Sequence, residues 1–205
     1  MVKVNAEVDT ATAARYRVRV YPTILVLQKD GTEVDRIVGY LRAPGFIQQA
    51  EDYLAGKGTL AMMVAEEKTR GSDPRFVSEL ADKYFGHGLT DEARVTYLRL
   101  IEIDPKNGTG QVDDALYTLA RMSRKQKDYA GDRKYAQRIL DRYPDSDMAH
   151  PAILEIAGAW RREGDLKKAR DLYLDYAKRY PQDEDAPWAK EQADTLSVRM
   201  RHAAS

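Results

Sequence analysis

The pattern of hydrophobic and polar positions changes character twice along the 205 residues of the chain. In the first part, residues 1–56, alternation over residues 2–5 predicts a short strand. Asp9 offers a cap for a helix that follows it. The apolar run Ile24–Leu27 comes next and is typical of a strand buried on both faces. This part of the chain is therefore predicted to mix strands and helices.

A turn and a helix complete this first part. Asp30-Gly31 is a hairpin signal, so Glu33–Gly39 is predicted to be the antiparallel partner strand. Pro44 suits the first position of a helix that ends before Gly56. We therefore expect residues 1–56 to form one α/β segment.

The second change of pattern is a junction at residues 57–73, where one amphipathic helix is expected. Asp73 as a cap and Pro74 as the first helical residue then mark a new start. Residues 74–205 are predicted to be helical throughout, and the last stretch, 186–201, keeps a helical spacing of apolar residues.

A spacing of small, aromatic and proline residues recurs within residues 74–205. The first copy is Val77, Leu80, Ala81, Tyr84, Ala93, Tyr97 and Pro105, and a second with identical spacing is Ile153, Ile156, Ala157, Trp160, Ala169, Tyr173 and Pro181. A degenerate copy lies between them and ends at Pro144. The pattern resembles the tetratricopeptide repeat, in which two antiparallel helices form each unit. The resemblance implies an α-solenoid of about three helical hairpins, closed by residues 186–201 as a capping helix.

The first part also resembles a known family. The order of strand, helix, Tyr21-Pro22-Thr23, hairpin and final helix is similar to the C-terminal half of a thioredoxin-like domain. In that family a proline with a cis peptide bond faces the active-site cysteines, and the residue before it presents its backbone to the substrate. The resemblance therefore implies a peptide- or substrate-binding role for Tyr21, Pro22 and Thr23. The residues alone leave open a trans proline that merely opens a strand.

The Cys-x-x-Cys half of such a domain is not in this sequence. The missing strand would lie between residues 2–4 and 24–28, and unpaired strand edges favour dimerisation. We expect that the chain is an N-terminally truncated piece of a longer protein. The alternative is a genuine half domain completed by a partner chain. The fold class is thus α+β, mostly helical, with a partial thioredoxin-like segment followed by helical repeats at 74–205.

Composition narrows the range of functions. There are 33 basic and 33 acidic residues and no cysteine. The balanced charge argues against nucleic acid as a partner, and the short apolar runs argue against a membrane span. Without cysteine, and with three histidines far apart and without evident acid partners, we expect no metal, no cofactor and no catalytic residue. A cytoplasmic location is expected for the chain as given, and a periplasmic or secreted one if a missing N-terminal region carries a signal.

Stacked helical hairpins present a concave groove lined by the first helix of each pair. The groove-facing positions are predicted to be Tyr117, Arg121, Arg124, Lys125, Arg161 and Arg162. Such a basic groove would suit an acidic peptide or a C-terminal carboxylate. The alternative is a solvated helix face whose arginines are balanced by Asp128, Asp132 and Glu163.

Two functions of different class remain. The first is a protein–protein interaction scaffold with a redox-inactive thioredoxin-like segment. The second is a truncated thiol-disulfide oxidoreductase whose Cys-x-x-Cys lies upstream and whose repeats select protein clients. A Cys-x-x-Cys upstream of the first strand would favour the second function.

Overall fold

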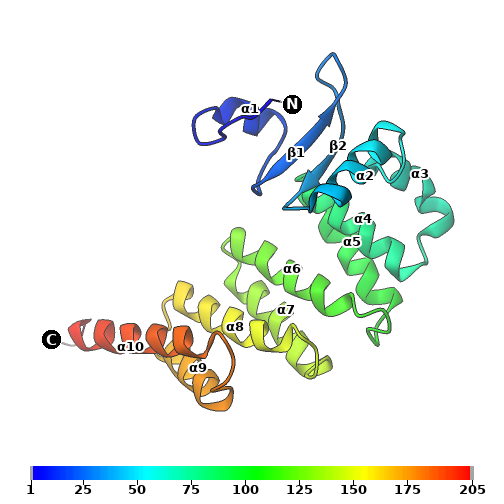
Figure 1. Ribbon diagram of the computed structural model, residues 1–205. Coiled ribbons are helices and arrows are strands. Elements are labelled where there is room, and N and C mark those ends of the chain that lie inside the picture. The colour runs from blue at the N-terminus through cyan, green and yellow to red at the C-terminus, as the bar shows by residue number, and fades with distance from the viewer. Residues whose placement is uncertain (1, 204–205) are drawn as a thin grey trace. The chain divides into compact units, whose positions relative to one another are not determined.

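The computed structural model describes residues 2–203 and contains two compact units, unit 1 (Met1–Ile103) and unit 2 (Asp104–Ser205). Unit 1 begins with a short helix and a β-hairpin and continues into helices (Figure 1). Its elements are α1 (Thr10–Arg15), β1 (Thr23–Leu27), β2 (Glu33–Val38), α2 (Ala43–Leu54), α3 (Leu60–Arg70), α4 (Pro74–Gly86) and α5 (Thr90–Ile103).

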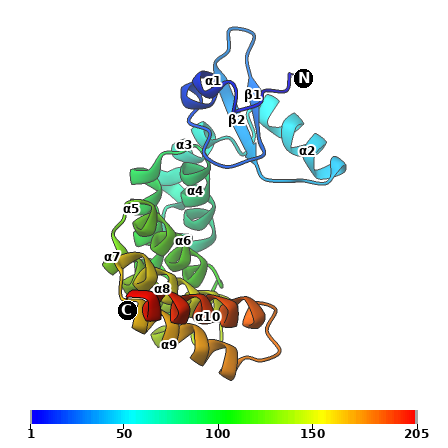
Figure 2. The same ribbon diagram turned by 90° about the vertical axis from the view of Figure 1, so that its left-hand side faces the viewer.

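The β-hairpin has the predicted antiparallel pairing, with Thr23 opposite Val38 and Ile24 opposite Ile37. The predicted strand at residues 2–5 is wrong, because those residues form no ladder. A strand needs a hydrogen-bonded neighbour, and in the described residues β1 pairs with β2 alone. For the same reason residues 24–26 are only half-buried and Leu27 is exposed, rather than the run being buried on both faces. Helix α2 packs beside the hairpin (Figure 2).

Local signals place the helix ends of unit 1 where the sequence predicts them. The side chain of Asp9 accepts a hydrogen bond from the Thr12 backbone, and that of Asp73 accepts one from Arg75. Proline stands in the first turn of both α2 and α4. Helices α4 and α5 form the first helical hairpin, and Ala81 and Ala93 are fully buried between them.

Unit 2 is entirely helical in the part that the structure describes. Its elements are α6 (Val112–Lys125), α7 (Tyr129–Arg142), α8 (Ala149–Glu163), α9 (Leu166–Arg179) and α10 (Ala186–Ala203). Consecutive helices pack against one another, and α10 packs on α9 as the expected capping helix. Pro144 and Pro181 follow the ends of α7 and α9, since proline cannot continue a helix.

The core of the third hairpin contains the small and aromatic residues that the spacing singled out. Ala157 and Ala169 are fully buried, and Tyr173 packs with them against α10. Gly164 ends α8 at a φ of 102°, a left-handed conformation that favours glycine. Asp165 then caps α9 by accepting from the Lys168 backbone.

The observed fold is mostly helical, with a small antiparallel sheet, three helical hairpins and a closing helix. The first hairpin belongs to unit 1 and the other two to unit 2. The expected domain boundaries at 56/57 and 73/74 stay predictions. In the described residues, no helix has the length and apolar character that crossing a membrane requires.

Candidate functional site

Unit 2 contains a cleft of about 460 Å³ that is lined by residues of α6, α8, α9 and the start of α10. Four of the six predicted groove residues line it, namely Tyr117, Arg124, Arg161 and Arg162. Arg121 and Lys125 do not line the cleft. The Arg121 guanidinium lies instead 5.9 Å from the ring centroid of Tyr117.

Two of the lining arginines are already held by partners. One Nη of Arg124 donates to both carboxylate oxygens of Glu155, at 2.6 and 2.9 Å. One Nη of Arg161 donates to the side-chain oxygen of Gln192 at 2.6 Å. Arg162 has no hydrogen bond or ion pair with any residue that the structure describes. It is the cleft arginine best able to meet a ligand.

A buried carboxyl pair adjoins this cleft, with Glu155 in the lining and Asp132 outside it. Asp132 on α7 is fully buried, and Glu155 on α8 is nearly so. Neither oxygen of Asp132 accepts a hydrogen bond from an N–H or hydroxyl of the described residues. Burial and the negative charge of Glu155 raise the pKa of Asp132 to about 7, although Arg124 opposes the rise. Asp132 can therefore stay protonated near neutral pH. In that form its hydroxyl can donate a hydrogen bond to the Glu155 carboxylate.

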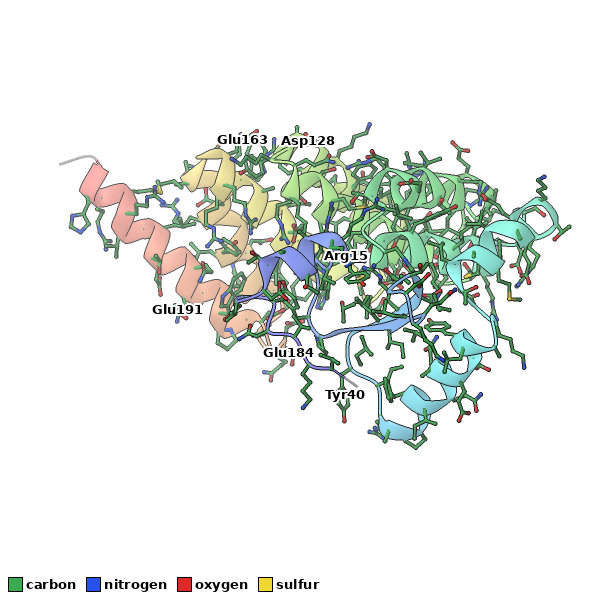
Figure 3. All side chains as sticks on the ribbon, turned by 90° about the horizontal axis from the view of Figure 1, so that it is seen from above. Arg15, Tyr40, Asp128, Glu163, Glu184 and Glu191 are labelled. Carbon is green, nitrogen blue, oxygen red and sulfur yellow. The ribbon has the colours of Figure 1, made fainter. Side chains whose placement is uncertain are left out.

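The three acids proposed to balance the groove arginines have other roles. Asp128 caps α7 by accepting from the Gly131 backbone, and Glu163 pairs with Arg133 at 2.7 Å. Both lie along one edge of unit 2, where α7 begins and α8 ends (Figure 3). Asp132 is buried rather than solvated. The balancing charge comes instead from Glu155, which the sequence analysis did not single out.

The other predicted site lies in unit 1. The Tyr21–Pro22 peptide bond is cis, as the resemblance implied. Tyr21 is 62% exposed. The Pro22 carbonyl accepts from Gly39 N at 2.8 Å, and the Thr23 hydroxyl donates to the Val20 carbonyl at 2.7 Å. The segment is thus fixed by its neighbours while the Tyr21 side chain stays accessible. A substrate-binding role for these residues stays a prediction.

Unit 1 contains a buried polar cluster that was not predicted from the sequence, called here the Asp35 cluster (Asp35, Lys83, His87 and Tyr53). Asp35 is fully buried and accepts from Lys83 Nζ at 2.7 Å and lies 3.0 Å from His87 Nε2. Lys83 Nζ also donates to Tyr53 Oη at 2.7 Å. The expectation that the histidines lack acid partners is therefore wrong. The signal was a charged pair, Asp35-Arg36, in the middle of a predicted strand.

A second histidine also has an acid partner. His150 Nδ1, at the start of α8, lies 2.7 Å from the Asp183 carboxylate, and its ring packs against Tyr180 with centroids 3.9 Å apart. The residues are 33 positions apart in sequence. Only the stacking of α8 against the loop after α9 brings them together, so no local pattern predicted the pair.

The structure defines a helical-repeat protein that carries a small thioredoxin-like segment at its N-terminal end. A family model described as a thioredoxin-like domain matches residues 3–54, and one described as a tetratricopeptide repeat matches residues 114–146 and 152–183. A search of curated proteins finds no match to the chain. The two repeat matches coincide with the second and third helical hairpins. Together the two domain types support a protein-interaction scaffold, since tetratricopeptide repeats bind protein partners.

Proposed function

We propose that this protein is an interaction scaffold that binds an acidic segment of a partner protein in the cleft of unit 2. The observation that carries the proposal is the convergence of Arg124, Arg161 and Arg162 on one concave surface. Arginine suits carboxylates because its planar guanidinium can donate two parallel hydrogen bonds. The rings of Tyr117 and Trp188 in the same cleft provide apolar contact area beside the charges.

Reversing the charge of Arg162 tests this function. We expect Arg162→Glu to weaken binding of a poly-glutamate peptide at least tenfold. The variant replaces the lining arginine that has no hydrogen bond or ion pair in the described residues with a negative charge, which repels the peptide. Arg138→Glu is the matched control, since Arg138 is exposed on α7 and does not line the cleft. Binding is measured by isothermal titration calorimetry at low salt. Equal weakening by both variants would reduce the effect to overall charge and contradict the proposal.

The thioredoxin-like segment is proposed to be redox-inactive in this chain. The 205 residues contain no cysteine, so the chain has no thiol with which to reduce or form a disulfide. We expect the purified chain to give no insulin reduction above that of dithiothreitol alone. Turnover that survives in the cysteine-free chain would contradict this. The exposed Tyr21 side chain beside Pro22 and Thr23 then serves as a non-redox peptide contact.

The oxidoreductase function remains the alternative for a longer protein with a Cys-x-x-Cys upstream. A dimer through the outer edge of β1, which pairs with no strand of the described residues, also stays a prediction and is decided by the mass in solution. The cytoplasmic location and the exclusion of nucleic acid as a partner also stay predictions.

A further inference from the structure

The hydroxyl of Tyr173 is a buried polar group of the cleft. Tyr173 is 1% exposed, lines the cleft, and its hydroxyl has no hydrogen-bond partner in the described part of the chain. Buried polar groups are nearly always hydrogen-bonded, because leaving one unpaired is energetically costly. Burial raises the pKa of this hydroxyl, so it keeps its proton and can donate. Such a group indicates a missing acceptor.

Two guanidinium groups lie close to that hydroxyl. Arg161 and Arg162 both act electrostatically on Tyr173, and Glu155 opposes them. Gly158, one helical turn before Arg162, brings the second guanidinium inward. A Cβ on Gly158 would lie 2.7 Å from Arg162 Nη1 and 3.6 Å from Tyr173 Oη. The space above Gly158 is thus shared by one positively charged donor and one neutral donor.

The charges of the cleft indicate what kind of anion fits. Three arginines line it, against the carboxylates of Glu155 and Asp185, which leaves one net positive charge. A carboxylate carries one negative charge, whereas a phosphate monoester carries nearly two at neutral pH. The two lining carboxylates would repel the second charge. The cleft therefore favours a monoanion over a dianion.

We propose, resting on the function proposed above, that the space over Gly158 is a carboxylate subsite in which Tyr173 Oη and the Arg162 guanidinium donate to one carboxylate of the bound segment. Gly158 is a positioning residue, because a Cβ there would lie 2.7 Å from Arg162 Nη1 and would make that guanidinium shift. Trp188, whose ring meets that of Tyr173 edge-on at 5.6 Å between centroids, forms the adjoining wall. The residue next to the carboxylate is accordingly apolar or aromatic.

Four short peptides on the full chain identify the anion and its source. Each has one phenylalanine among glycines and differs in the residue next to it. Three have an amidated C-terminus and carry a glutamate, a glutamine or a phosphoserine, so they present a side-chain carboxylate, no anion or a phosphate. The fourth carries a glutamine and has a free C-terminal carboxylate. Binding is followed by the NMR shift of the Trp188 indole N–H. We expect one or both carboxylate peptides to bind and the neutral peptide to bind at least tenfold more weakly. Tighter binding of the phosphopeptide would overturn the assignment to a carboxylate.

Tyr173→Phe then tests the subsite itself, because it removes a single oxygen. We expect about tenfold weaker binding of the carboxylate peptides, the effect of one hydrogen bond to a charged group. Tyr176→Phe is the matched control: Tyr176 is equally buried on α9 but does not line the cleft, so its change should leave affinity within twofold. Gly158→Ala should weaken binding as well, because the added methyl displaces Arg162. Thermal unfolding of each variant confirms that it is folded.

The outcomes separate the subsite from the function it rests on. If no carboxylate peptide binds the wild-type chain, both proposals fail. If the wild type binds but Tyr173→Phe and Tyr176→Phe bind equally well, only the subsite is overturned. If Tyr173→Phe weakens the carboxylate and neutral peptides by the same factor, the hydroxyl does not contact the anion, and the subsite is overturned too.

Discussion

The Asp35→Asn variant is expected to lose about 3–5 kcal/mol of unfolding free energy in unit 1, the usual cost of removing one partner of a buried ion pair. Asp35 is fully buried and accepts from the backbone N–H groups of Arg36 and Leu60 as well as from Lys83 Nζ. An asparagine keeps the shape but loses the charge and part of the acceptor capacity. Lys83 would then hold its positive charge in a site that disfavours it.

The same cluster joins parts of unit 1 that are far apart in sequence. Lys83 and His87 come from the last turn and the end of α4, Asp35 from β2, and Leu60 from the start of α3. Arg36 adds hydrogen bonds from β2 to the carbonyls of Tyr16 and Gly86. Losing Asp35 should therefore loosen the contact between the thioredoxin-like hairpin and the first repeat, rather than one helix alone.

Hydrogen exchange of the α4 amides measures this loss directly. Both tryptophans of the chain, Trp160 and Trp188, lie in unit 2, so tryptophan fluorescence reports that unit instead. The control is Glu51→Gln, the same chemical change at an exposed position on α2. Unchanged exchange in α4 for Asp35→Asn would show that the cluster does not stabilise unit 1.

Low pH should imitate this variant. Burial alone would raise the pKa of Asp35, but the hydrogen bonds from His87, Lys83 and Arg36 outweigh it and lower the pKa to about 2, from an ordinary value of 3.8. The unfolded chain therefore takes up this proton at a higher pH than the folded chain. The stabilisation is complete above about pH 4 and is lost as the pH falls toward 2. The variant should lack this part of the acid sensitivity.

Elements whose signals are local were predictable from the sequence. Asp9, Asp73 and Asp165 each cap the helix that follows, and the glycine and proline positions mark the ends of the helices. The repeat spacing predicted the helical hairpins because each small residue must lie where two helices approach closely. The strand at residues 2–5 failed because a strand depends on a neighbour that sequence periodicity does not contain.

The cleft was predictable only in part, for a related reason. Helical spacing identified the helix face that carries Arg124, Arg161 and Arg162. It could not show which residues of that face lie outside the cleft, so Arg121 and Lys125 were also predicted to line it. Spacing also could not show which acids meet those arginines. Glu155 pairs with Arg124 across 31 residues, and the contact exists only because α6 and α8 pack together.

The Asp132→Asn variant is expected to be more stable than the wild type at pH 8, by on the order of 4 kcal/mol. In the folded chain burial and the neighbouring Glu155 raise the pKa of Asp132 to about 7, from an ordinary value of 3.8. Between these two pH values the folded state holds a proton that the unfolded state has released. The wild type is therefore destabilised as the pH rises from about 4 to 7, and an asparagine removes that loss.

The test is the difference in unfolding free energy between variant and wild type, followed from pH 4 to pH 8 by tryptophan fluorescence. The difference should be smallest near pH 4, where Asp132 holds a proton in the folded chain and the unfolded chain is only beginning to release it, and should grow until the pH exceeds 7. Asp141→Asn, at an exposed position on the same helix, supplies the control and should give a profile parallel to the wild type. A profile for Asp132→Asn that also runs parallel to the wild type would mean that the buried carboxyl titrates normally. Glu155 and Arg124, whose side chains are hydrogen-bonded to each other, are both unchanged in this variant, so a change in stability would belong to Asp132.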